Sequence, residues 1–174
     1  MGDLMTRRTF VGTAGVLAGA GMRSAGATGE ISPEGKTLIL GVSCSPRAGM
    51  TTATAIEAAL EAAKAVAPRV EVELADLGGM AIAGWTGGAR PGEGKEVADD
   101  FATLLPALRS PNLGGLIIGS PVYFRAMSSL CKAFVERLAV LRTPKLLLAD
   151  KPVGVLAVGG YRNGGQELVI DQLQ

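Results

Sequence analysis

The chain has 174 residues, the usual length of a single domain with one core, and 48% of them are hydrophobic. Its 17 Lys and Arg residues nearly balance 16 Asp and Glu residues, and no basic cluster stands out in the body of the sequence. This balance argues against a nucleic-acid surface, because duplex binding depends on many cationic contacts to phosphate.

The first 27 residues differ from the rest of the chain and predict an export signal. A pair of arginines, Arg7 and Arg8, precedes a short, weakly apolar run, and a small-x-small site ends at Ala27. This pattern is typical of a twin-arginine signal peptide, and the run is too short for a stable membrane span. We expect a linker over residues 28–35 and export to the periplasm or another extracytoplasmic space; a leader without function is the alternative.

The two cysteines, Cys44 and Cys131, do not make a metal site, because the chain has no histidine to complete one. We therefore predict no metal and interpret both cysteines as small packed residues. A disulfide in an oxidising compartment stays open as the alternative, since sequence does not show whether the two residues are within reach.

Residues 38–64 predict a short apolar strand, a loop rich in Ser and Thr, and a long amphipathic helix. Ile56, Leu60, Ala63 and Ala67 share one face of that helix. The first N–H groups of a helix have no intrahelical acceptor and carry the positive end of its dipole. The loop therefore favours a phosphate site, and an ordinary turn capped by Ser and Thr is the alternative.

The middle of the chain continues the alternation of strands and helices. Residues 70–74 predict a half-exposed edge strand, and the glycine-rich residues 76–95 are a candidate lid or partner surface. A helical stripe follows at Val97, Phe101, Leu104, Leu105 and Leu108, and Pro106 should shorten it. We interpret Asp99 and Asp100, near its start, as solvated acids that complement the helix dipole.

The last third of the chain predicts two more strands and two more helices. Residues 115–119 form a continuous apolar run, typical of a strand buried on both faces, and a helix is expected from Met127 to Leu141. The aromatic loop between them, residues 120–125, is interpreted as a wall for a planar ligand, with core packing as the alternative. Residues 153–158 predict a fourth buried strand, and a short helix begins after Gly165.

This alternation predicts an α/β fold with a parallel sheet and right-handed crossovers. Ligands of such sheets bind at the carboxyl ends of the strands, near a switch point in the strand order. Three unusual loops, after residues 43, 119 and 158, follow strands at that edge, so we expect the binding site there.

These three loops carry a resemblance to a known family. Residues 45–52 read Ser-Pro-Arg-x-Gly-x-Thr-Thr, residues 119–134 begin Gly-Ser-Pro-Val-Tyr-Phe and end Leu-Cys-Lys-Ala-Phe, and residues 159–167 read Gly-Gly-x-Arg-Asn-Gly-Gly-Gln-Glu. In this order and spacing they resemble the NADPH-dependent FMN reductase and iron–sulfur flavoprotein branch of the flavodoxin-like superfamily. The resemblance implies a three-layer flavodoxin-like domain over residues 36–174, with sheet order 2-1-3-4(-5).

The resemblance also implies an FMN site, carried over by position. The FMN phosphate would be held by Ser45, Arg47, Thr51 and Thr52. The isoalloxazine ring would be flanked by Pro121, Val122, Tyr123 and Phe124 and contacted on its far side by Gly160, Arg162, Asn163 and Gly164. No catalytic side chain is implied, because the flavin itself supplies the chemistry.

The chain departs from the family pattern in three places. It lacks the cysteine cluster that iron–sulfur members carry in the region of residues 81–99. Cys44 and Arg125 stand where the family has glycine. A fifth strand and its helix are expected to be missing, which would leave residues 153–158 as an exposed apolar edge.

The function implied is that of an FMN-dependent oxidoreductase. It would take electrons from NAD(P)H or a protein donor and pass them to a quinone, a flavin or a redox protein. A non-enzymatic electron carrier and a flavin-free interaction domain are the alternatives, and the apolar edge makes a homo-oligomer an expected form.

Overall fold

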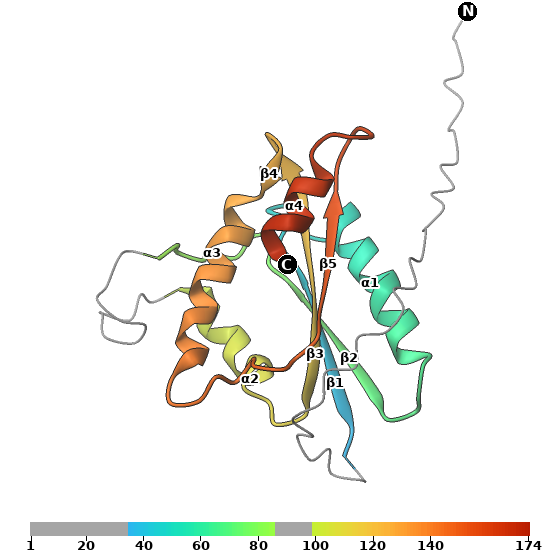
Figure 1. The fold of residues 1–174 in the computed structure, drawn as a ribbon, viewed down its shortest axis with the longest axis vertical. Helices are drawn as coiled ribbons and strands as arrows, with labels where there is room; N and C mark the ends of the chain where they lie inside the picture. Colours follow the sequence, from blue (N-terminus) through green and yellow to red (C-terminus); the bar gives the residue numbers. More distant parts are fainter. Residues whose placement is uncertain (1–34, 86–98) are drawn as a thin grey trace, which may run out of the picture. The chain divides into compact units, whose positions relative to one another are not determined.

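The computed structural model describes residues 35–85 and 99–174 (Figure 1). The expected signal peptide and nearly all of the expected linker lie outside these residues, as do Val97 and the second half of the glycine-rich connection. No helix in the described ranges is long and apolar enough to cross a membrane.

The described residues form a sheet of four parallel strands with a short antiparallel addition. In sequence order the parallel strands are β1 (Thr37–Ser43), β2 (Val70–Asp76), β3 (Leu113–Tyr123) and β5 (Val153–Val158). Their spatial order is β2-β1-β3-β5, and β4 (Ala126–Met127) pairs with the end of β3. The predicted parallel α/β fold is confirmed, with β5 in the fourth position and β4 as an element that the sequence did not predict.

Helix α1 (Thr51–Lys64) covers one face of the sheet. Ile56 and Leu60 are buried as predicted, whereas Ala67 lies beyond the helix end. A Cβ atom at Gly41 or Gly119 would come within 2.5 and 2.8 Å of Ile56, respectively, so these two glycines let the helix approach the strands closely.

The other face is covered by short helices that share one hydrophobic core. They are the 3₁₀ helix η1 (Asp100–Leu104), α2 (Leu105–Leu108), α3 (Ser129–Arg137) and the 3₁₀ helix η2 (Leu138–Arg142). The predicted helical stripe is thus a 3₁₀ turn and a single α turn, because Pro106 lies in the first turn of α2. The helix predicted from Met127 begins two residues later, because Met127 belongs to β4.

Strand β5 lies at one edge of the sheet. Helix α4 (Gln166–Leu173) follows it and packs against β3, β4 and β5. The apolar pattern of this strand indicated burial on both faces, which is wrong, whereas the expectation of an exposed edge is confirmed. Val153 and Gly154 are exposed and the rest of β5 is half-buried. The reason is that β5 pairs with β3 on one side, and no strand of the described residues pairs with its other edge.

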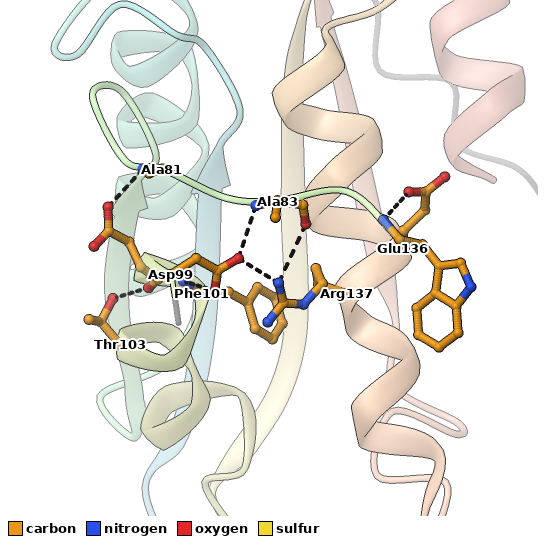
Figure 2. A network of polar contacts seen from close by, with 9 residues as sticks. Ala81, Ala83, Asp99, Phe101, Thr103, Glu136 and Arg137 are labelled. Carbon is orange, nitrogen blue, oxygen red and sulfur yellow. Dashed lines mark hydrogen bonds and ion pairs between the residues drawn. The ribbon is translucent and has the colours of Figure 1, made fainter. Parts of the chain in front are cut away.

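A buried ion pair joins Asp99, at the start of η1, to Arg137, at the end of α3 (Figure 2). The two side chains are only 5% and 12% exposed. Asp99 also accepts hydrogen bonds from the N–H groups of Ala83 (2.9 Å) and Phe101 (3.2 Å), and the Arg137 guanidinium lies 4.9 Å from the centroid of the Phe101 ring. The prediction that both acids are solvated is therefore wrong for Asp99.

Two further carboxylates hold residues 81–85 in place (Figure 2). Asp100 accepts from the N–H of Ala81 at 2.7 Å, and Glu136 of α3 accepts from the N–H of Trp85 at 2.8 Å. The Trp85 N–H, with a smaller contribution from Lys132, lowers the pKa of the Glu136 carboxyl. The backbone of residues 81–85 is thus held by three carboxylates, those of Asp99, Asp100 and Glu136.

Candidate functional site

The loops after β1, β3 and β5 leave the sheet at the same edge. The strand register sets this arrangement, because Ser43 pairs with Gly119 and Pro121 pairs with Val158. Figure 1 shows β4 and the β5–α4 loop together at this end of the sheet. The residues predicted to form the site therefore gather at the carboxyl ends of the parallel strands, where such folds bind ligands.

The loop between β1 and α1, residues 44–50, forms a compact turn. Ser45 is buried, and its Oγ accepts a hydrogen bond from the N–H of Arg47 at 3.2 Å. The backbone of Gly49 has a φ of +65°, which glycine adopts without strain. Arg47 and Thr51 are exposed and Thr52 is buried, so the loop offers both surface and recessed donors.

Asp76 and Gly78, at the end of β2, support this loop and were not among the predicted site residues. The Asp76 carboxylate accepts from the N–H of Gly49 at 2.6 Å and from the N–H of Gly78 at 3.2 Å. A Cβ atom at Gly78 would lie 2.2 Å from the backbone nitrogen of Ala48, so only glycine fits there. An acid at the end of a strand, followed within three residues by two glycines, is the sequence signal that could have identified these two supporting residues.

The N-terminus of α1 is open to a ligand. Its N-cap residue, Met50, makes no side-chain hydrogen bond to the helix, and the first turn contains no acid. Ser43, at the end of β1, has a buried Oγ with no hydrogen-bond partner in the described structure. Unpaired N–H groups, the helix dipole and a cluster of hydroxyls make a donor set that fits a phosphate group.

The aromatic segment after Gly119 is a hairpin rather than the loop predicted over residues 120–125. Strand β3 continues to Tyr123 because β4 pairs with it, with Val122 opposite Met127. Pro121 is buried, Tyr123 is 37% exposed and Phe124 is fully exposed. Of the residues predicted to flank a ring, Tyr123 and Phe124 thus present exposed aromatic side chains, whereas the side chain of Pro121 is buried.

The turn of this hairpin shows why a glycine would suit position 125, where this chain has Arg125. Phe124 and Arg125 have φ values of +50° and +64°, in the left-handed region that favours glycine. A glycine at position 125 would adopt this conformation without cost, and Arg125 adopts it with some strain. A Cβ atom at Gly165 would lie 2.8 Å from the Cα of Arg125, so the hairpin turn packs closely against the β5–α4 loop.

The β5–α4 loop, residues 159–165, is held by the side chain of Gln166. Its Nε2 donates to the carbonyl of Tyr161 at 2.6 Å, and its Oε1 accepts from the N–H of Gly164 at 2.8 Å. Three of the residues predicted to contact the far side of a ring are exposed on this loop: Gly160, Arg162 and Asn163. The N–H of the fourth, Gly164, is already engaged within the loop.

The described residues also form two grooves away from these loops, each along α3. One, of about 480 Å³, lies between α3 and residues 80–84, and the other, of about 500 Å³, lies between α3, η2 and residues 146–149. None of the predicted site residues lines either groove. These two grooves are therefore separate from the candidate site at the three loops.

The sequence of residues 37–174 matches the model of the NADPH-dependent FMN reductase family. Two curated relatives are iron–sulfur flavoproteins, one of Methanosarcina thermophila (32% identical over 135 residues) and one of Methanocaldococcus jannaschii (34% over 138 residues). Each alignment covers 78% of this chain, and they cover 70% and 68% of the two relatives, respectively.

Two solved structures share the fold. One is an NADH:FMN oxidoreductase in its apo form, with a TM-score of 0.58 and 25% identity over 79% of this chain. The other is RosB with a bound 8-demethyl-8-formylriboflavin-5'-phosphate intermediate, with a TM-score of 0.57 and 19% identity over 80% of this chain. The chain spans 65% and 57% of the lengths of these two proteins.

The chain has too few cysteines to hold an iron–sulfur cluster by cysteine alone. It has two in all, whereas a four-iron cluster takes four cysteine ligands. Both are buried beside the β1–α1 loop and the start of α3. The match over residues 37–174 and the parallel sheet together support an FMN-binding oxidoreductase, and the chain belongs to the NADPH-dependent FMN reductase family.

Proposed function

We propose that this protein binds FMN across the loops after β1, β3 and β5 and acts as an FMN-dependent oxidoreductase. Its electrons would come from NAD(P)H or a protein donor and pass to a quinone, a free flavin or a redox protein. The observation that carries the proposal is the open N-terminus of α1, which lies among hydroxyl groups at the carboxyl edge of the sheet.

In this proposal the β1–α1 loop binds the FMN phosphate. The hydroxyls of Ser45, Thr51 and Thr52 and the first N–H groups of α1 donate to its oxygens, and the Arg47 guanidinium adds a charge-assisted contact. Asp76 holds the loop in shape through Gly49. The chain's contribution here is binding and orientation, because the flavin supplies the redox chemistry when it is bound.

The other two loops bind the ring in the same proposal. Tyr123 and Phe124 offer exposed aromatic side chains for stacking, and the backbone of Val122 continues the strand beneath them. Gly160, Arg162 and Asn163 line the far side. Pro121, which is buried, and Gly164, whose N–H is engaged, act as supports for these residues.

The experiment is a calorimetric titration of the purified full chain with FMN, followed by anaerobic addition of NADPH or NADH. Riboflavin, which lacks the phosphate, is the matched control ligand and should bind more weakly. Bleaching of the flavin absorption band by a nicotinamide supports a reductase. Binding without bleaching would favour the electron carrier, and no binding would overturn the flavoprotein proposal in favour of an interaction domain.

Export through the twin-arginine pathway is a separate proposal, supported by Arg7, Arg8 and the small-x-small site at Ala27. A protein outside the cytoplasm would meet little soluble nicotinamide, which is why a protein donor stays in the proposed function. Replacing both arginines by lysine should keep the protein inside the cell. Unchanged export after fractionation would contradict the proposal.

Self-association is also proposed, through the outer edge of β5. Val153 at this edge is 48% exposed, and Gly154 beside it is also exposed. Exposed strand edges with apolar side chains favour pairing with another chain. Sedimentation would show a dimer or larger species if the proposal is right, and a monomer at all accessible concentrations would contradict it.

A further inference from the structure

Cys44 and Cys131 form a buried pair between the β1–α1 loop and the first turn of α3. Both residues are 0% exposed and both are free thiols. The backbones of both residues are hydrogen-bonded to the same hydroxyl group, that of Ser128, although 87 positions separate the two cysteines in sequence. The fold therefore brings together the chain's two cysteines, which sequence alone could not pair.

Ser128 fixes the geometry of the pair. Its Oγ donates to the carbonyl of Cys44 at 2.7 Å and accepts from the N–H of Cys131 at 3.0 Å. Ser120 adds a second constraint, because its Oγ accepts from the N–H of Ser128 at 2.9 Å. One hydroxyl group thus binds the backbones of both cysteines, which places the two residues beside each other.

The two thiols differ in acidity. The hydrogen bond to Cys44, with a further one to Ser120, lowers the pKa of the Cys131 thiol, and the start of α3 favours a thiolate at the same place. The same hydrogen bond, together with burial, raises the pKa of Cys44. Because Cys131 also lies in the first turn of α3, whose dipole favours a negative charge, we assign Cys131 as the nucleophile and Cys44 as the thiol that resolves it.

We propose that Cys44 and Cys131 are a redox-active thiol pair that a small hydroperoxide oxidises to an intramolecular disulfide. The sulfur of Cys131 attacks the hydroxyl oxygen of the peroxide, so that an S–O bond forms and the O–O bond breaks, and the second oxygen takes the proton of the Cys131 thiol and leaves as water or an alcohol. The sulfur of Cys44 then attacks the sulfur of Cys131, an S–S bond forms, and the hydroxyl leaves with the Cys44 proton as water.

The electron balance of this reaction requires a two-electron oxidant, and a hydroperoxide is one. Two thiols lose two electrons and two protons, and one hydroperoxide is reduced by the same two electrons. Because neither cysteine is exposed, a bulky disulfide is a poor fit, whereas hydrogen peroxide is close to water in size. The bond would join Cys44, the first residue of the loop that we propose for the FMN phosphate, to α3.

The first test uses the wild-type full chain without added flavin. After reduction and then treatment with hydrogen peroxide, the protein is alkylated, digested with trypsin and analysed by mass spectrometry. We expect both thiols to lose their reactivity and peptide 37–47 to be linked to peptide 126–132, with a mass two hydrogens below their sum. Two thiols that stay alkylatable, or sulfur acids without a cross-link, would overturn the proposal in favour of an inert packed pair.

Single variants test the two roles. In Cys44→Ala the thiol of Cys131 should form a sulfenic acid that a dimedone probe traps once the oxidised protein is unfolded, whereas Cys131→Ala should react with peroxide at least about tenfold more slowly. The reverse order of reactivity would overturn the assignment of Cys131 as nucleophile. FMN titration of the oxidised and reduced wild type is read separately, so that a chain that binds no FMN removes the proposed function and leaves the thiol result standing.

Discussion

Two polar regions of this protein differ in whether their polar groups have hydrogen-bond partners within the protein. In the network around Asp99 and Arg137, the carboxylate and the guanidinium are both buried and both have protein partners (Figure 2). In the β1–α1 loop, the helix begins without a cap and the Oγ of Ser43 is buried without a partner. Satisfied polar groups hold a fold together, whereas the uncapped N–H groups at the start of a helix, at the carboxyl edge of a sheet, are available to a ligand.

The same contrast separates two helix N-termini at the carboxyl edge of the sheet. Ser128 caps α3 and also bonds to the carbonyl of Cys44, so no ligand is needed there. Met50 leaves α1 uncapped. If this comparison is right, substitutions in the satisfied groups, around Asp99 and Ser128, change the free energy of unfolding. Substitutions in the β1–α1 loop change FMN affinity instead.

The largest effect is expected for Asp99→Ala. This substitution leaves the Arg137 guanidinium buried without its partner, which should lower the free energy of unfolding by about 3–5 kcal/mol. Denaturant titration measures the change. Asp100→Ala is the matched control, because its carboxylate is exposed and makes one backbone contact worth about 1 kcal/mol. Equal losses in the two variants would show that the ion pair does not hold the region.

The next effect is expected for Arg47→Ala, on binding rather than on stability. Loss of a charge-assisted phosphate contact should weaken FMN binding by about 1.5–3 kcal/mol, or roughly 10- to 150-fold. The unfolding free energy should stay within about 0.5 kcal/mol, because the side chain is exposed. Arg69→Ala, an exposed arginine before β2, is the control for calorimetry. Unchanged affinity in the Arg47 variant would remove Arg47 from the site.

A smaller effect is expected for Ser128→Ala, which removes the cap of α3. The unfolding free energy should fall by about 0.5–2 kcal/mol, and FMN affinity should change little. Thermal melts of this variant are compared with those of Ser129→Ala, whose side chain is exposed on the same turn. A loss of FMN binding larger than the loss of stability would mean that the two helix ends do not have separate roles.

The smallest and most discriminating effect is expected for Met50→Asp. An acidic cap at α1 should raise the unfolding free energy by about 1 kcal/mol, because Met50 already has the extended conformation of an N-cap and is half-exposed. The same carboxylate would compete with phosphate, so FMN affinity should fall. Met50→Ala controls for loss of the side chain. Changes of the same sign in stability and in affinity would contradict an open anion site at this helix.

The sequence by itself determined the α/β class and the edge of the sheet at which the three candidate loops lie. Alternating strand and helix periodicities predicted the parallel sheet, because the exposure of side chains along each element is a local property. The loop over residues 44–50 was recognisable for the same reason, since helix-start chemistry depends on adjacent residues. Its resemblance to a known family then ordered the strands, and the structure confirms that order.

Only the tertiary structure decided which distant groups meet. Asp99 was predicted to be a solvated acid that complements a helix dipole, and its actual partner, Arg137, is 38 positions away. The bond between Ser128 and Cys44 spans 84 positions. Such pairs depend on how helices pack on the sheet, which local periodicity does not encode. The same is true of β4, since a two-residue strand has too few side chains to show a pattern and exists because the end of β3 lies beside it.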